Sequence, residues 1–347
     1  MYTLAELRNI PIFFIVGKGR SGTTLLSTIL DSHPEVASAT ESRFLLMLWQ
    51  KYKHQKTWNP TNAQQFIDDL MVDLRIQNLW EFNDELKDNL AALPPETTIQ
   101  DLIKLVYLQR KSSFPKGKIK IIVDKNPMYT LLVDRLIHIF PEAKFYRLIR
   151  DPRDNITSHL KYSKNGSGML AYKWLNFNTK LDRFGEKHLT QLKTQRFEDL
   201  ILNNALFFEE FESYFGIKRL SEVESKRLAY KDKIEEKLND RLKDQHQASV
   251  KPLDPTKVGH YKQKLKAAQI RRIEAICFPY AQKYNYELPE RQSTVGVVEL
   301  TKWKFKNFYR DLASVFFYSI PFFMMKMISD RMIKKINYTE KNETSLS

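Results

Sequence analysis

A glycine-rich segment between an apolar run and a helix constrains this chain more than any other feature. Three of the ten glycines, Gly17, Gly19 and Gly22, lie within six residues. The preceding run Ile12–Val16 is entirely apolar, which predicts a strand buried on both faces. The apolar residues of Gly22–Asp31 follow helical spacing. The sequence therefore predicts a strand, a tight loop and a helix in immediate succession.

This loop has the chemistry of an anion site. Glycines let the backbone turn so that N–H groups and the helix N-terminus face an anion. Hydroxyl and guanidinium groups add donors, and the predicted contacts are Lys18, Gly19, Arg20, Ser21, Gly22, Thr23 and Thr24. Thr23 stands where a nucleotide triphosphatase loop has lysine, which argues against triphosphate hydrolysis. The alternative is a glycine turn that only connects strand to helix.

Strands and helices alternate along much of the chain. Further strands are predicted at Ile119–Val123, Phe145–Ile149 and Leu192–Phe197, and a helix over 132–140. This alternation predicts an α/β fold with a parallel β-sheet flanked by helices. Glu41–Lys111 is expected to form a mostly helical insertion, and Ser221–Lys251 a charged, solvated helix.

A second motif begins where the strand Phe145–Ile149 ends. Arg150 directly follows that strand, and Asp151-Pro152 has the residue types of a helix N-cap and first turn. Ser158 lies two turns into this helix. Arg150 can thus meet an anion at the carboxyl edge of the sheet, where open α/β folds bind ligands. The alternative is a surface helix with local ion pairs.

Together the two motifs resemble the sulfotransferase family that uses 3′-phosphoadenosine 5′-phosphosulfate (PAPS). The resemblance covers about residues 11–290 and implies a P-loop NTPase-like sulfotransferase fold, with a domain over 8–290. The Arg150 to Ser158 spacing is that of the family, which uses these residues to hold the 3′ phosphate. Leu30–Val36 and Thr40–Arg43 resemble the branch that includes tyrosylprotein and glycan sulfotransferases and bacterial relatives.

The resemblance also assigns roles to single residues. Glu41 is the implied base, Lys125 and Arg20 are implied catalytic groups near the transferring sulfuryl group, and Arg43 is an implied acceptor contact. Gly259 and Lys262 resemble the loop that closes over the phosphates. Phe197 stands where the family usually has tyrosine, so an aromatic contact to the cofactor remains without the hydroxyl.

The base can be argued from the residues as well. Sulfuryl transfer to an alcohol needs a group that takes the hydroxyl proton. The small-molecule branch uses a histidine, and none of the seven histidines has the sequence context of that residue. The resemblance therefore still implies Glu41 as the base, with a surface or structural carboxylate as the alternative. No Asp/His cluster predicts a metal, and none is expected.

The implied function is transfer of a sulfuryl group from PAPS to a hydroxyl, with an amine as second choice, releasing adenosine 3′,5′-bisphosphate. A lipid, sterol or glycan is the expected type of acceptor. One alternative is a nucleotide-dependent kinase with a P-loop. The other is a non-catalytic relative that binds a nucleotide or an anionic lipid.

Charge and the C-terminal tail suggest further partners. The net charge of +15 favours anionic partners. No nucleic-acid-binding motif is evident, and we do not expect the protein to bind nucleic acid. The single cysteine, Cys277, excludes intrachain disulfides. The basic, aromatic tail 298–347 suits an anionic membrane surface, with packing or homodimer formation as the alternative. Leu312–Met325 is uncharged but too short to span a bilayer. We expect a cytoplasmic protein, peripheral on the inner face of the membrane.

Overall fold

The computed structural model describes residues 2–230, 249, 251–289 and 295–329, and the chain divides into two compact units. Unit 1 comprises the described parts of Met1–Pro11, Glu41–Ser112 and Ala313–Ser347. Unit 2 comprises those of Ile12–Thr40 and Ser113–Leu312. We describe each unit separately.

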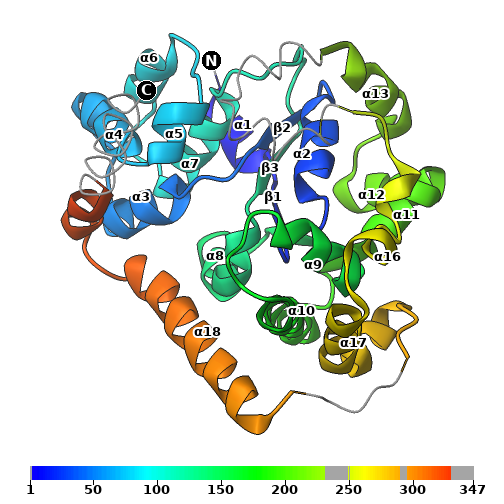
Figure 1. Ribbon diagram of the computed structural model, residues 1–347. Helices are drawn as coiled ribbons and strands as arrows, with labels where there is room; N and C mark the ends of the chain where they lie inside the picture. Colours follow the sequence, from blue (N-terminus) through cyan, green and yellow to red (C-terminus); the bar gives the residue numbers. More distant parts are fainter. Residues whose placement is uncertain (1, 231–248, 250, 290–294, 330–347) are drawn as a thin grey trace, which may run out of the picture. The chain divides into compact units, whose positions relative to one another are not determined.

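Unit 2 is built on a five-stranded, wholly parallel sheet (Figure 1). The strand order is β2-β3-β1-β4-β5. The strands are β1 (Ile12–Val16), β2 (Val36–Ala39), β3 (Ile121–Lys125), β4 (Lys144–Ile149) and β5 (Leu192–Arg196). The predicted α/β class is confirmed.

Four strands differ from the sequence-based prediction. Strand β4 begins one residue earlier, at Lys144, and β5 ends one residue earlier, at Arg196, so that Phe197 begins the following helix. Strand β3 begins and ends two residues later than predicted, at Ile121 and Lys125. Strand β2 was not predicted, because its sequence VASA is short and has only one large apolar residue. It forms because Val36 pairs with Ile121 of β3 and the strand is buried on the sheet.

Alternate side chains of the central strands enter the two faces of the sheet, as the twofold period of a strand requires. On one face, Phe13 and Tyr146 share a core with Phe211 and Phe215, where Phe13 stacks 4.4 Å from Phe215. On the other face, Phe145 packs 4.8 Å from Phe184. Both faces are therefore covered, which explains the unbroken apolar run of β1.

Helices connect the strands and cover both faces (Figure 1). Those before β5 are α2 (Thr23–Asp31), α8 (Val133–Ile139), α9 (Pro152–Leu160) and α10 (Ser167–Lys187). Those after it are α11 (Phe197–Leu202), α12 (Asn204–Phe215), α13 (Leu220–Arg227), α16 (Tyr261–Lys264) and α17 (Ala267–Ala281). Most of the charged helix predicted for 221–251 lies outside the described residues.

Unit 1 is helical where the structure describes it, as predicted for the insertion. Its helices are α1 (Leu4–Asn9), α3 (Phe44–Tyr52), α4 (Ala63–Leu70), α5 (Leu74–Leu79), α6 (Leu86–Ala91) and α7 (Ile99–Leu108). An aromatic cluster forms its core, with Phe44 5.5 Å from Trp80 and 5.0 Å from Tyr107. Lys104 of α7 donates to the Leu7 carbonyl oxygen at 3.0 Å and so ties α1 to α7.

The described part of the tail forms α18 (Val297–Phe317) and a shorter helix, Phe322–Ser329. Among the described residues no single helix is long and apolar enough to cross a membrane.

Candidate active site

The sheet topology gathers the two motifs at one edge. The glycine loop follows β1, Lys125 ends β3 and Arg150 follows β4. Because β1 pairs with both β3 and β4 in parallel register, these three segments leave neighbouring strands at the same carboxyl edge. Ligands of open α/β sheets bind at this edge, where the strand order reverses.

The glycine loop adopts an unusual backbone conformation. Gly17, Arg20 and Gly22 have φ angles of +126°, +69° and +90°. The Thr130 hydroxyl accepts from the Gly17 N–H at 2.7 Å and so anchors the start of the loop. Gly22 is the N-cap of α2 and, lacking a side chain, provides no side-chain cap. The helix N-terminus is therefore left for another acceptor, such as an anion.

Helix α9 supports the loop through one of its faces. Asn155 donates from Nδ2 to the Gly19 carbonyl oxygen and to Ser21 Oγ, each at 3.0 Å. Three residues further, Ser158 Oγ accepts from Arg20 Nε at 3.1 Å. The structure therefore brings Ser158 into contact with the loop arginine, as well as onto the helix that follows Arg150.

Arg150 lies buried between the loop and the chain that precedes α16. Its guanidinium donates to the Arg20 carbonyl oxygen at 3.3 Å and to the Lys257 carbonyl oxygen at 2.8 Å. Its Nε is buried and has no hydrogen-bond partner in the described part of the chain. Burial lowers the pKa of Arg150 despite nearby acidic groups. A buried cation with an unpartnered donor points to an anionic ligand at this position.

Lys18 adds a buried amine to the same loop. Its Nζ contacts His159 Nε2 and lies 6.0 Å from the centroid of the Phe177 ring. Burial, with smaller contributions from Lys173, Arg310 and Arg20, lowers the pKa of Lys18 to about 7. Burial and the neighbouring Lys18 and Arg20 lower the pKa of His159 to about 2, so the imidazole is neutral. Burial is thus the main cause of the lowered pKa of Lys18, and nearby cations add to it.

Lys125 reaches the start of α2. It is fully buried, and its ammonium donates to Thr24 Oγ1 at 3.3 Å. The side chain thus joins β3 to the first turn of the helix that follows the glycine loop. This places a positive charge beside the glycine loop, where the sequence predicts an anion site.

The loop around Gly259, which the resemblance predicts to close over the phosphates, is hydrogen-bonded to α9. Gly259 has φ +74°, and its N–H donates to Asp154 Oδ2 at 2.7 Å, while the Tyr261 N–H donates to Asp154 Oδ1 at 2.8 Å. Burial raises the pKa of Asp154. Lys262 is exposed, so its ammonium group is accessible to a ligand, whereas the Gly259 N–H is occupied by the carboxylate.

Glu41 and Arg43 belong to unit 1, where the chain arrives two residues after β2 ends. Arg75 donates to Glu41 Oε2 at 2.7 Å. The Arg43 N–H donates to Asp73, and the Arg43 guanidinium lies 5.8 Å from the Phe317 ring centroid. Both residues therefore have partners within unit 1.

Residues 11–219, more than half of the chain, match a sequence model described as the Sulfotransferase family. The chain belongs to this family. The sulfotransferase resemblance inferred from the two motifs is therefore confirmed.

Relatives and solved structures agree with the family assignment. This chain is 26% identical over 168 residues to a protein-tyrosine sulfotransferase of Drosophila melanogaster, covering 48% of this chain and 29% of the relative. It is 24% identical to protein-tyrosine sulfotransferase 1 of Rattus norvegicus, covering 52% and 42%. The match thus spans less than half of these relatives' length. The sulfotransferase domain of the Synechococcus PCC 7002 olefin synthase is 20% identical with a TM-score of 0.52, covering 80% of this chain and 96% of that domain, which supports the fold.

Sequence reasoning missed several residues that shape this site. Asn155 could have been found, since it shares with Ser158 a face of the helix that begins at Asp151. Asp154 and His159 belong to the same helix, but nothing in their sequence context reveals that they contact Gly259 and Lys18. Thr130 carries no sequence signal at all.

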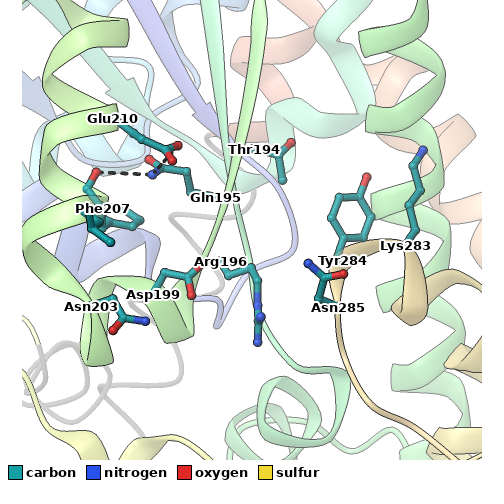
Figure 2. A pocket seen from close by; sticks show the side chains of 11 residues that line it. Thr194, Gln195, Arg196, Asp199, Asn203, Phe207, Glu210, Lys283, Tyr284 and Asn285 are labelled. Carbon is teal, nitrogen blue, oxygen red and sulfur yellow. Dashed lines mark hydrogen bonds between the residues drawn. The ribbon is translucent and has the colours of Figure 1, made fainter.

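A separate cavity of about 410 Å³ lies beside β5 and the short helix that follows α17. Figure 2 shows Gln195 donating from Nε2 to Glu210 Oε2 and to the Phe207 carbonyl oxygen, at 3.3 and 3.4 Å. Two basic residues, Arg196 and Lys283, line this cavity, and Lys283 pairs with Asp182 at 2.6 Å. The lining includes neither the glycine loop nor Arg150, so this cavity is distinct from the loop edge described above.

Proposed function

We propose that this sulfotransferase transfers a sulfuryl group from PAPS to a hydroxyl group of an acceptor and releases adenosine 3′,5′-bisphosphate. The observation that carries the proposal is the buried Arg150, whose Nε has no partner in the described residues and which adjoins the glycine loop. The uncapped N-terminus of α2 adds donors for a second anionic group. Two anion sites on adjoining segments suit a donor with phosphates at both ends of its ribose.

When bound, PAPS supplies an electrophilic sulfuryl group attached to its 5′ phosphate. The loop N–H groups and Arg20 would orient that end, and Arg150 with Ser158 would hold the 3′ phosphate. Lys125 would balance the negative charge that grows on the phosphate oxygen as its bond to sulfur breaks. Phe197 would offer an aromatic face beside Arg150.

Glu41 is the proposed base. It would accept the acceptor's hydroxyl proton while the acceptor oxygen forms its bond to sulfur. Arg75 holds the Glu41 carboxylate at 2.7 Å, which favours the ionised form that a base requires. Arg43 is proposed as a contact to the acceptor.

The acceptor is proposed as a class only. The relatives named above are protein-tyrosine sulfotransferases, so a phenolic hydroxyl is one candidate. The basic, aromatic tail favours a lipid, sterol or lipid-linked glycan, with an amine as a less favoured acceptor. In every case the nucleophile is a neutral group that must lose a proton.

The test compares three nucleotides by calorimetry on the full chain. Adenosine 3′,5′-bisphosphate should bind at least tenfold more tightly than adenosine 5′-phosphate, because the 3′ phosphate reaches a charged donor. ATP should bind more weakly than the bisphosphate, since Thr23 stands in place of the lysine that contacts the β and γ phosphates. Tightest binding of ATP would favour the kinase alternative and overturn the proposal.

A further inference from the structure

Helix α18 has one face that packs on α10. Trp303 fills the space beside Gly168, where a Cβ atom would lie 2.3 Å from Trp303 Cη2. Asn307 Nδ2 lies 3.3 Å from Met169 Sδ, and Asp311 accepts from Asn176 at 3.1 Å. Trp303, Asn307 and Asp311 recur at every fourth residue, so one side of the helix is docked on α10.

The opposite face exposes an apolar stripe. Its members have a helical spacing of seven, four, three and four residues, and half or more of each side chain is exposed. They are Val298, Phe305, Tyr309, Leu312 and Phe316, with exposed fractions of 68, 58, 63, 50 and 64%. At ~1.5 Å per residue the stripe is about 27 Å long. A continuous exposed apolar stripe of this kind marks an interaction surface.

The charges beside the stripe are positive. Lys302, Lys304 and Lys306 are all exposed on the same helix. The acidic side chains of α18 are engaged elsewhere, Glu299 with Arg272 at 3.3 Å and Asp311 with Arg310 at 2.7 Å. The free side of the helix therefore presents apolar groups flanked by cations.

The segment after α18 extends this pattern. The chain bends by 116° between Val297–Phe317 and Phe322–Ser329. The second helix exposes Phe323, Met324 and Met327, and Lys326 is exposed among them. Taken together, the two helices are long and apolar enough to be compatible in length and composition with crossing a membrane, whereas neither described helix is so alone.

We propose that the apolar stripe of α18 docks the protein on the surface of an anionic lipid bilayer. Aromatic side chains with flanking lysines match the apolar boundary and the negative headgroups of such a surface. A second copy of this chain is a poorer occupant, because two α18 stripes facing each other would bring lysines against lysines. The proposal concerns binding only, so it stands or falls independently of the proposed reaction.

The test is flotation of the full-length protein with vesicles, at 50 and 300 mM salt, without donor or acceptor. Vesicles of phosphatidylcholine with about 30% phosphatidylserine should bind the protein, and should do so less at high salt. Pure phosphatidylcholine vesicles should bind it at least tenfold more weakly.

Two variants and two matched controls locate the surface. The pair F305S/F316S and the triple K302E/K304E/K306E should each weaken binding to the anionic vesicles at least tenfold. The pair L189S/L206S and the triple K87E/K187E/K264E change exposed residues elsewhere and should bind like the parent. Thermal melts confirm that each variant is folded.

Three outcomes overturn the proposal. The parent protein fails to float with anionic vesicles at 50 mM salt, or the stripe and control variants bind equally. The third is a parent protein that is dimeric by light scattering and that F305S/F316S makes monomeric without any change in vesicle binding. In that case a second copy covers the stripe.

Discussion

The guanidinium carbon of Arg150 lies 4.3 Å from the centroid of the Phe197 ring, and the same ring lies against Gly22. A Cβ atom on Gly22 would lie 2.3 Å from Phe197 Cδ2. One buried ring therefore contacts both the glycine loop and the arginine that follows β4. The absence of a hydroxyl on Phe197 leaves this packing intact, so the ring has a structural role at the site besides the one inferred from its resemblance.

Gly22→Ala tests this packing. The φ of +90° is a strained conformation for alanine, and the new methyl group would displace the Phe197 ring. We expect a loss of about 1–3 kcal/mol in unfolding free energy, measured by urea denaturation. We also expect weaker binding of adenosine 3′,5′-bisphosphate. Gly166→Ala is the control, because its Cβ would meet nothing within 4 Å.

Arg150→Ala tests the assignment of the 3′ phosphate. A hydrogen bond to a charged group is worth about 1.5–3 kcal/mol, so affinity for adenosine 3′,5′-bisphosphate should fall about tenfold or more. Affinity for adenosine 5′-phosphate should change little. Calorimetry with both nucleotides measures the difference, and Arg183→Ala, an exposed position on α10, is the control. Equal losses for the two nucleotides would contradict the assignment.

Glu41→Gln tests the base. The side chain keeps its size but cannot take a proton, so turnover should fall by roughly 10²–10⁴ while nucleotide binding persists. The ion pair with Arg75 is partly exposed, so stability should change little. Glu85→Gln, exposed in unit 1, should keep parental turnover. Unchanged turnover of Glu41→Gln would assign the proton transfer to another group, with His260 the next to test.

The sequence predicted those parts of the fold that local pattern determines. The apolar run of β1, the helical spacing after the loop and the Asp151-Pro152 cap all appear where expected; Asp151 accepts from the Arg153 N–H at 2.8 Å. Strand β2 escaped prediction because pairing with β3, and not its own composition, makes it a strand.

The site was predictable where its residues adjoin the glycine loop or follow a strand, and not where a contact joins distant segments. Arg20 and Ser158 were both singled out, but their hydrogen bond depends on how α9 packs beside the loop. Thr130 contacts Gly17 across 113 residues, and no local pattern encodes such a pairing. Likewise, the cationic surroundings of Lys18 come from Lys173 and Arg310, far along the chain.

Lys18→Met tests those surroundings through the pH dependence of stability. The folded pKa of about 7 lies below the unfolded value of about 10.4, so between these values the unfolded chain binds more protons. Stability of the parent should therefore rise with pH across this window, by up to about 1.4 kcal/mol per pH unit from this group. Methionine removes that contribution. The variant should thus be most stabilised relative to the parent at pH 6.5, and the difference should shrink by pH 9.

Urea denaturation of both proteins at pH 6.5, 8 and 9 measures the difference in their unfolding free energies. The contributions of groups that titrate alike in the two chains cancel in this difference. Adding saturating adenosine 3′,5′-bisphosphate should reduce the pH dependence of the parent, because an anion near Lys18 stabilises the charged amine and raises its pKa. Parallel pH curves for the parent and Lys18→Met would show that Lys18 keeps an ordinary pKa in the folded chain, and the buried amine would then have to be balanced by a negative group near the loop.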